Sequence, residues 1–320
     1  HILAEPQRTN LFPYSEDFSQ WLNISSTDTP NYSTAPDGTN TATRLLTSSQ
    51  DSSYLYVSSL TISDATSYTL SIYVKSNGNG LDDFRLYTTT GGTSANLTAT
   101  TEWQRFDYNL TSTTTWTNIG IRGVGGQDTD VLVWGASLEE GSYATSYIPT
   151  SGSTVTRNQD IFTRDGIGSL INSVEGTFFA EISKPITSLD NHSIISLNNA
   201  TSNSDSNSLA IGFDSGQDFY IRLRANGSSI FTDNNRASSS NTFYKIAVAY
   251  KSGASLIYVD GIPITPVQGS LTDVFSFSET LDNLSFDYNG NNVLPFYGNV
   301  RQLQVYKTAL TDTQLAALTS

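Results

Sequence analysis

The sequence predicts an all-β protein built from two tandem antiparallel β-sandwiches of the jelly-roll type, followed by a short C-terminal helix. Short runs that alternate apolar and polar residues recur along the chain, as expected of strands with one buried face. Asn-Gly, Asp-Gly and Gly-Gly pairs separate many of these runs and favour tight turns. The alternation pauses after Leu138 and resumes near Phe178, so the 320 residues divide into two halves.

In the first half, the alternating runs extend from Tyr54 to Leu138. They are SYTLSIYVKS, LDDFRLYTT, WQRFDYNL, WTNIGIRGV and VLVWGASLEE, and the first buries Leu70, Ile72 and Val74 on one face. Many short strands with such punctuation are typical of a β-sandwich. The faces expected to point away from the core carry large polar or aromatic side chains, which are Tyr73, Arg85, Tyr87, Trp116 and Arg122.

The second half continues with strand-like runs that differ in detail from those of the first. These runs are GTFFAEISKP, HSIISLNN, SLAIGFDSG, DFYIRLRANG, YKIAVAYKSG, SLIYVDGIPI, DNLSFDYNG and GNVRQLQVYK. Phe219, Ile221 and Leu223 form the buried face of one strand. The opposite face of that strand is expected to carry Tyr220, Arg222 and Arg224. At the end of the chain, residues 311–314 read as a capping box and predict a short helix against the sandwich.

The stretch from Glu139 to Asp160 offers little to bury and is rich in Ser, Thr and Gly. Because strand-like alternation stops before it and restarts after it, we interpret it as the seam between two domains. Tyr143, Tyr147 and Ile148 give this seam apolar side chains that can pack against a sandwich. The predicted domains are residues 1–157 and residues 158–320.

The composition disfavours several classes of function. A formal net charge of −14, with 16 basic residues spread over the chain, disfavours nucleic-acid binding and docking on an anionic membrane. No window of 18 apolar residues occurs, so we expect no membrane insertion. The absence of Cys removes disulfides, thiolate nucleophiles and Cys-ligated zinc. We expect His1 to be either a cut end of a larger polypeptide or an end introduced for expression, since the N-terminus has neither an initiating Met nor a signal-peptide pattern.

Groups that could support catalysis are scarce, and we predict that the protein is not an enzyme. Ser–His–Asp catalysis would depend on His192, because the other histidine is His1. Paired carboxylates could support glycoside hydrolysis, but the eight Glu residues are scattered. No cofactor is required. Oxygen ligands for calcium are conceivable at two places, Glu16 with Asp17 and Asp128 with Asp130.

Glycan binding requires different groups, and both halves offer them. Aromatic rings stack on the C–H face of a sugar, while Arg, Asn, Asp and Gln side chains bind its hydroxyls. The outward residues of the first half therefore form a candidate ligand platform, unless a loop or second sheet covers them or the alternation slips at a bulge. A second candidate platform consists of Tyr220, Arg222 and Arg224 with the loop residues Asn234, Asn235 and Arg236. We interpret Trp21, Trp103 and Trp134 as core anchors.

Several stretches resemble known families. NLFPYSEDFSQW, YTLSIYVKS, EWQRFDYNL and VWGASLEEGSYATSYIPTSGSTVTRNQD resemble a domain frequent in bacteriophage tail-fibre and tail-associated proteins. The N-terminal part, with Asn10, Leu11, Phe12, Phe18 and Trp21, also looks like the start of jelly-roll carbohydrate-binding modules. From about residue 176 onward, FYKIAVAYKSG, LIYVDGIPI, GNVRQLQVYKTAL and LTDTQLAALTS resemble laminin-G or concanavalin-A-like sandwiches.

The resemblance implies a virion or secreted adhesin that recognises a glycan, and structural calcium is a further implication of the same kinship. We therefore predict a non-catalytic protein that binds a cell-surface or extracellular polysaccharide. Its expected location is extracellular or on a phage tail. Two alternatives remain open, which are a structural spacer or assembly domain that binds other virion proteins or a second copy, and the binding part of a polysaccharide depolymerase.

Overall fold

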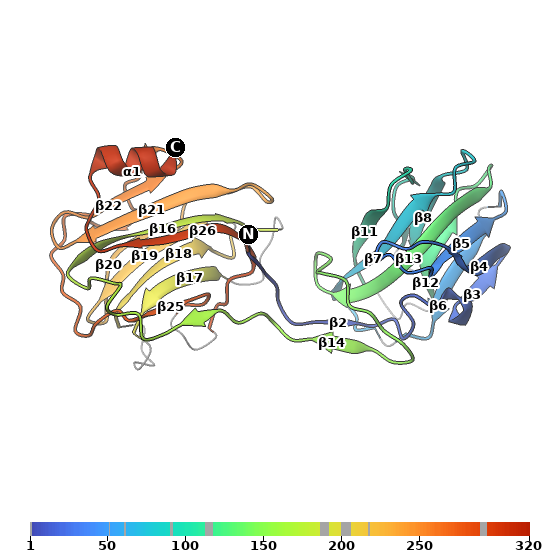
Figure 1. The fold of residues 1–320 in the computed structure, drawn as a ribbon, viewed down its shortest axis with the longest axis horizontal. Coiled ribbons are helices and arrows are strands. Elements are labelled where there is room, and N and C mark those ends of the chain that lie inside the picture. The colour runs from blue at the N-terminus through green and yellow to red at the C-terminus, as the bar shows by residue number, and fades with distance from the viewer. Residues whose placement is uncertain are drawn as a thin grey trace. The chain divides into compact units, whose positions relative to one another are not determined.

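Strands dominate the structure along the whole chain, as the ribbon in Figure 1 shows. The computed structural model describes residues 2–50, 52–60, 62–89, 92–112, 118–185, 192–199, 206–216, 218–288 and 293–320. A helix, α1 (Asp312–Thr319), lies near the C-terminal end. The predicted all-β class and the predicted C-terminal helix are confirmed.

The described residues group into two compact units, which we name by their place in the chain. Residues 7–158 form the insert unit, and residues 1–6 together with residues 159–320 form the terminal unit. The insert unit therefore interrupts the terminal unit after its first strand. Each unit contains a core of its own.

The N-terminal strand β1 (Ile2–Ala4) departs from the predicted division, which placed it in the first domain. It pairs antiparallel with β26 (Gly298–Tyr306) of the terminal unit, with Ile2 opposite Val300. Ala4 is buried in the core of that unit. Three residues are too few to reveal a strand period, so the sequence pattern carries no signal for this pairing.

The insert unit is a sandwich of antiparallel sheets. One sheet, which we call the β12 sheet, has the strand order β10-β8-β12-β6-β3, with β9 paired to β8. The other, which we call the β13 sheet, has the order β11-β7-β13-β5-β4. The strands of the β12 sheet are β3 (Leu22–Ile24), β6 (Tyr54–Ser58), β8 (Asp83–Thr88), β9 (Gly92–Thr93), β10 (Leu97–Thr98) and β12 (Asn118–Gly123). Those of the β13 sheet are β4 (Ser26–Ser33), β5 (Ala42–Thr47), β7 (Ser67–Ser76), β11 (Gln104–Thr111) and β13 (Thr129–Glu140).

The core of the insert unit lies between these sheets. Leu86 and Ile121 of the β12 sheet pack in one cluster with Val74 and Val133 of the β13 sheet, and all four are at most 1% exposed. Burying each such side chain stabilises the fold by about 1.5–3 kcal/mol. Because side chains alternate along a strand, the intervening residues face outward, on opposite sides of the sandwich for the two sheets.

The terminal unit is a second antiparallel sandwich, with strand orders β1-β26-β16-β21-β22-β23 and β15-β25-β17-β18-β19-β20-β24. The first of these sheets also contains β16 (Glu175–Ser183), β21 (Tyr244–Lys251), β22 (Leu256–Val259) and β23 (Ile262–Pro263). The second contains β15 (Thr163–Arg164), β17 (Ser193–Asn198), β18 (Ser208–Phe213), β19 (Phe219–Ala225), β20 (Ser228–Asp233), β24 (Gln268–Gly269) and β25 (Asn283–Ser285).

Helix α1 begins at the predicted capping box. Thr311 is the N-cap, and its backbone N–H donates to the Gln314 side chain at 3.0 Å. Leu315 anchors the helix on the outer face of a sheet, in one buried cluster with Phe179 of β16 and Tyr258 of β22. Among the described residues, no helix has the length and apolar character needed to span a membrane.

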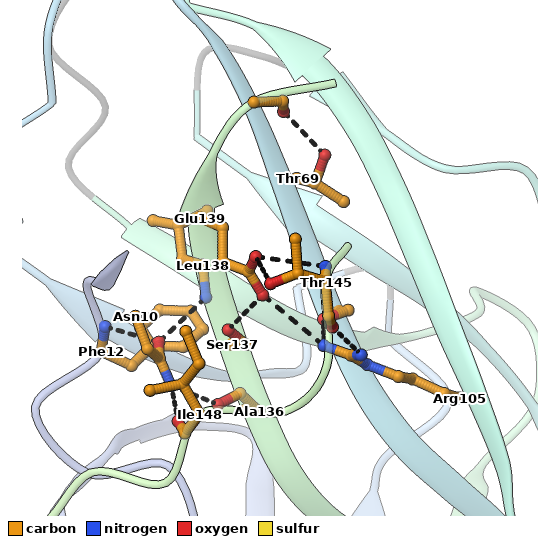
Figure 2. A network of polar contacts seen from close by, with 12 residues as sticks. Asn10, Phe12, Thr69, Arg105, Ala136, Ser137, Leu138, Glu139, Thr145 and Ile148 are labelled. Carbon is orange, nitrogen blue, oxygen red and sulfur yellow. Dashed lines mark hydrogen bonds and ion pairs between the residues drawn. The ribbon is translucent and has the colours of Figure 1, made fainter. Parts of the chain in front are cut away.

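The predicted seam is fixed to the insert unit by a buried polar network, which Figure 2 shows. The Glu139 side chain is fully buried, where it accepts hydrogen bonds from Ser137 Oγ at 3.0 Å and Thr145 Oγ1 at 2.6 Å. Arg105 Nη2 lies 3.7 Å from the same carboxylate, and Arg105 also donates to the Thr145 carbonyl. Farther along the seam, β14 (Val155–Arg157) pairs with β2 (Arg8–Asn10).

Candidate functional site

The outward face of the β12 sheet carries a group of partly exposed aromatic and basic side chains. Strand pairing arranges this face in two cross-strand rows. The first row runs Ile24, Tyr54, Arg122 and Arg85 across β3, β6, β12 and β8. The second row runs Leu22, Tyr56, Gly120 and Tyr87 across the same strands. We call Tyr54, Tyr56, Arg85, Tyr87 and Arg122 the Tyr–Arg face.

The alternation of each strand explains why these side chains point outward. Leu55 of β6, Leu86 of β8 and Ile121 of β12 are buried in the core of the insert unit. Their neighbours in sequence must therefore project from the other face of the sheet. All five side chains of the Tyr–Arg face are partly exposed, so a ligand can reach them.

Two tyrosine rings meet across the middle strand of this face. Tyr54 and Tyr87 belong to strands on either side of β12, whose backbones lie about 9–10 Å apart, yet their ring centroids are 4.6 Å apart. Gly120, which lies directly opposite Tyr56 and Tyr87 on the intervening strand, adds no side chain to this part of the face. Glycine is required there, since a Cβ atom at Gly120 would lie 2.1 Å from the Leu55 carbonyl oxygen.

The arginines of the face are held in place by aromatic and amide groups. The Arg122 guanidinium carbon lies 5.2 Å from the Tyr54 ring centroid and 5.9 Å from that of Tyr87. Arg85 Nε donates a hydrogen bond of 2.6 Å to the Asn96 side chain. A preformed site of this kind loses little side-chain entropy when a ligand binds.

The chemistry of the Tyr–Arg face suits an amphipathic ring. The tyrosine rings can pack against C–H bonds, and the guanidinium groups can donate paired hydrogen bonds to hydroxyls or carboxylates. In the described part of the chain, the hydroxyls of Tyr54, Tyr56 and Tyr87 have no protein partner, so they can also bond to a ligand. Such a combination of stacking surface and hydroxyl contacts is what a sugar requires.

Tyr73 does not belong to this face, contrary to the predicted platform. It lies on β7 of the β13 sheet, on the opposite side of the sandwich, where it pairs with Trp134. Its ring contacts those of Trp134 and Tyr147 at 5.6 and 6.4 Å, and the Arg105 guanidinium lies over it. The alternation of a strand shows which side chains point outward, but it does not show to which sheet the strand belongs. For this reason Tyr73 was wrongly grouped with residues of the β12 sheet. Trp116, also predicted for the platform, lies outside the described residues.

The three tryptophans predicted as core anchors differ in their surroundings. Trp21 is buried in the main core of the insert unit. Trp134 is 5% exposed and belongs to a separate cluster on the outer side of the β13 sheet. Trp103 packs against that cluster but is only partly buried, and its Nε1 donates to the Thr34 carbonyl at 3.1 Å. Trp21 and Trp134 are therefore buried, as a core anchor must be, whereas Trp103 lies at the edge of a cluster and is only partly buried.

The second predicted platform lacks an exposed aromatic ring. Tyr220, Arg222 and Arg224 do lie on the face of β19 opposite the core, but Tyr220 is only 7% exposed. It packs in a buried cluster with Tyr288, and Arg222 donates to the hydroxyls of both tyrosines at 3.1 and 2.6 Å. Tyr220 therefore offers no open ring for stacking, and the prediction of an aromatic platform here is wrong in that respect.

The remaining residues of that platform are partly engaged in local structure. Arg224 donates to the Gly227 carbonyl in the turn after β19. Arg236 pairs with Asp233 at 2.9 Å and donates to a backbone carbonyl at 3.2 Å. Burial raises the pKa of Asp233, against the effect of Arg236. Two further loop residues are partly or fully exposed beside them, Asn234 and Asn235.

Three of the four acidic residues considered for calcium are engaged in other contacts, and the fourth, Asp128, is exposed. Asp130 accepts bidentate hydrogen bonds from Arg44 at 2.7 and 2.6 Å, and amide groups of Asn77 and Asn79 also donate to it. A cation would have to displace this guanidinium, so this pair does not fit a metal. Glu16 accepts from the Tyr147 hydroxyl at 2.9 Å, and Asp17 caps the short helix η1 (Phe18–Gln20). No cluster of three acidic or histidine side chains suited to a metal occurs among the described residues.

Sequence reasoning missed Tyr54, Tyr56 and Gly120 as members of the face. The alternation in YLYVS was available as a signal for both tyrosines, since it places them on the same side of β6. The role of Gly120 depends on the close approach of β6, which the sequence does not reveal. Leu22 and Ile24 lie in a strand of three residues, too short for a recognisable period.

Comparison with known proteins supports a lectin-like domain in the terminal unit. Residues 183–316 match a laminin G family model described as the concanavalin A-like lectin/glucanases superfamily. This stretch of the chain is therefore similar to concanavalin A-like lectin/glucanase domains. The comparison with curated proteins finds no match.

Several solved structures are similar to part of this chain at low sequence identity. The carbohydrate-binding module of the Ruminococcus gnavus IT-sialidase has 16% identity and a TM-score of 0.39, covering 50% of this chain and 98% of its own. A pentraxin of Limulus polyphemus has 16% identity and a TM-score of 0.36, covering 47% and 72%. Domain 4 of the arabinanase AbnA of Geobacillus stearothermophilus, solved with arabinotriose, has 18% identity and a TM-score of 0.36, covering 57% and 83%.

Proposed function

We propose that the chain is a non-catalytic glycan-binding protein and that the Tyr–Arg face of the insert unit receives the sugar. The observation that carries this proposal is the contact of Tyr54 and Tyr87 across β12, with Arg122 beside both rings. These groups are partly exposed and are held in one arrangement before any ligand arrives. The lectin-like domain in the terminal unit gives independent support for glycan binding.

A single shallow face of this kind should bind weakly. Ring stacking and a few hydroxyl contacts are consistent with a Kd of about 1 mM to 10 μM for one site. Many copies displayed together would raise the apparent affinity for a polysaccharide through multivalency. We propose an extracellular setting, on a phage tail or a secreted adhesin. The N-terminal half resembles a domain of tail-associated proteins, and a polysaccharide offers many copies of one ligand to proteins displayed in this way.

The test is a glycan array with the wild-type chain and two variants, Tyr54→Ala and Tyr87→Ala. Each variant should bind at least about tenfold more weakly, since losing one stacked ring removes about 1.4 kcal/mol or more. Both should unfold close to the wild-type temperature, because the rings lie on the surface. Tyr32→Ala is the matched control, since Tyr32 is a 47% exposed tyrosine on β4, outside the face.

Two results would contradict the proposal. If both variants bind the same glycans as strongly as the wild type, the Tyr–Arg face is not the site. If the control variant loses binding to the same extent, the ligand lies on the β13 sheet side instead.

A further inference from the structure

The edge strand β3 extends the Tyr–Arg face with two exposed aliphatic side chains. Leu22 is 49% exposed and Ile24 is 41% exposed. Leu22 lies directly opposite Tyr56, and Ile24 lies directly opposite Tyr54. Side chains of directly paired residues lie on the same face of a sheet, so the aliphatic groups continue the surface of the tyrosine rings.

In β3, the apolar side chains lie on the opposite face of the sheet from those of the neighbouring strands. In β6, β8 and β12, the apolar residues face the core. In β3, the outward positions carry Leu22 and Ile24, and the intervening position carries Asn23, whose amide donates to Asp28 at 2.5 Å. Edge strands commonly carry charged residues, which prevent pairing with other chains. Because Leu22 and Ile24 point away from the core, they do not contribute to its packing. An exposed aliphatic pair on an edge strand therefore needs another explanation.

Resting on the proposed function, we propose that the glycan bears a methyl-containing substituent that packs on Leu22 and Ile24. The sugar ring would stack on the tyrosines, and an acetyl group or the methyl group of a 6-deoxy sugar would extend past Tyr54 and Tyr56 onto β3. A plain hydroxyl or hydroxymethyl group would gain little from this aliphatic surface. The pair would thus select the substituent, while the tyrosines and arginines bind the ring.

The geometry is consistent with this division of roles. The two aliphatic side chains are adjacent on one strand face, about 6.5–7 Å apart along it, which suits a single small substituent. Their exposed surface lies beside Tyr54 and Tyr56, which bear stacking surface, and three strands away from Arg85, which bears hydrogen-bond donors. An apolar group at one end and polar contacts at the other would fix the orientation of the sugar on the face.

The experiment measures binding of matched carbohydrate pairs by isothermal titration calorimetry. The pairs are chitotriose with cellotriose for the N-acetyl group, an O-acetylated polysaccharide with its alkali-treated form for the O-acetyl group, and L-fucose with L-galactose for the 6-deoxy methyl group. The wild type should prefer the methyl-bearing member of at least one pair by about fourfold or more, since burying one methyl group is worth about 0.8 kcal/mol. The preferred pair identifies the source of the methyl group.

The variants separate the substituent from the ring. The double variant Leu22→Thr/Ile24→Thr keeps strand propensity and should reduce the preference to less than about twofold while still binding the unsubstituted member. Tyr54→Ala should weaken binding of both members. Val155→Thr, at a 38% exposed apolar position on β14 of the same unit, is the matched control. It should change neither the preference for the methyl-bearing member nor the affinity for the unsubstituted one.

The outcomes distinguish this inference from the proposed function. If the wild type binds both members of every pair equally, or the double variant retains the preference, the inference is overturned while glycan binding stands. If no pair binds and Tyr54→Ala leaves binding on the glycan array unchanged, both are overturned. If sedimentation shows a wild-type dimer that the double variant abolishes, the aliphatic pair serves contact with a second copy instead.

Discussion

At the residue scale, Gly120 shows how one position can support a binding surface. The β6 backbone approaches so closely that a Cβ atom has no room there. On the same face, Tyr54 and Tyr87 meet with Arg122 beside both rings. A larger residue at Gly120 would force β6 and β12 apart and would therefore disturb the strands that carry this stacking surface.

Alternation predicted the outward direction of Arg85, Tyr87 and Arg122, because each neighbour in sequence is a core residue. It could not separate Tyr73 from them, since both sheets of a sandwich have an outward face. It also could not reveal that Tyr220 is covered, because the rings that contact it, those of His192 and Tyr288, lie far away in the sequence. Direction is a local property of a strand, whereas exposure depends on tertiary contacts.

Asp130 provides a prediction about pH at the residue scale. Burial alone would raise the pKa of its carboxyl, but hydrogen bonds from Arg44, Asn79 and Asn77 hold it below the usual value of 3.8. A lowered pKa means that this stabilisation is fully present above the unfolded-state value and is lost as the pH falls through the folded-state value. Asp130→Asn should therefore destabilise the insert unit by about 1.5–3 kcal/mol at neutral pH.

Urea unfolding from pH 7 down to about pH 2 checks this prediction. The difference in free energy of unfolding between wild type and variant should shrink as the pH falls below 3.8. Asp128→Asn is the control, because Asp128 is exposed and only two residues away. A difference that stays constant over the whole pH range would show that the charge of Asp130 is not the cause.

At the scale of elements, the seam illustrates why composition is a poor guide to order. Its Ser, Thr and Gly content suggested a loop with little to bury, yet buried contacts hold it. Ile148 is 3% exposed, and the Tyr147 hydroxyl lies 2.6 Å from Ser15 Oγ. The sequence predicted both anchors from their apolar character. It could not predict the polar network around Glu139, since its members come from β11, β13 and the seam.

Glu139 should be among the most sensitive positions of the seam. Its buried carboxylate compensates Arg105, and removing one partner of a buried pair commonly costs about 3–5 kcal/mol. Glu139→Ala should lower the free energy of unfolding by that amount and make the seam more sensitive to limited proteolysis. Glu140→Ala is the matched control and should change the stability by less than about 0.5 kcal/mol, because Glu140 is exposed. Equal effects of the two substitutions would exclude the proposed role of the buried network.

At the scale of the whole molecule, the chain enters the terminal unit, leaves it for the insert unit and then returns. The residues at which the chain leaves and re-enters the terminal unit lie close together. Glu5 N–H donates to the Asp160 side chain at 2.9 Å, and Asp160 N–H donates to the Glu5 carbonyl at 2.9 Å. Domain insertion is favoured at places where two chain ends already lie side by side. The sequence predicted two cores but not the insertion, because β1 is too short to be recognised.

This arrangement predicts that the insert unit can be removed without unfolding the terminal unit. Joining Pro6 to Gln159 through a short Gly-Ser turn keeps β1 paired with β26 and Ala4 in its core. The joined chain should unfold in one cooperative thermal transition, with a melting temperature within a few degrees of the terminal unit in the full chain. A second chain consisting of residues 159–320 alone lacks β1, loses the burial of Ala4 and leaves the edge of β26 unpaired, so it should melt at a lower temperature. Calorimetry compares the three proteins. If the joined chain melts no higher than the truncated one, β1 contributes nothing to the terminal unit; if the joined chain shows no cooperative transition, the terminal unit depends on the insert for its stability.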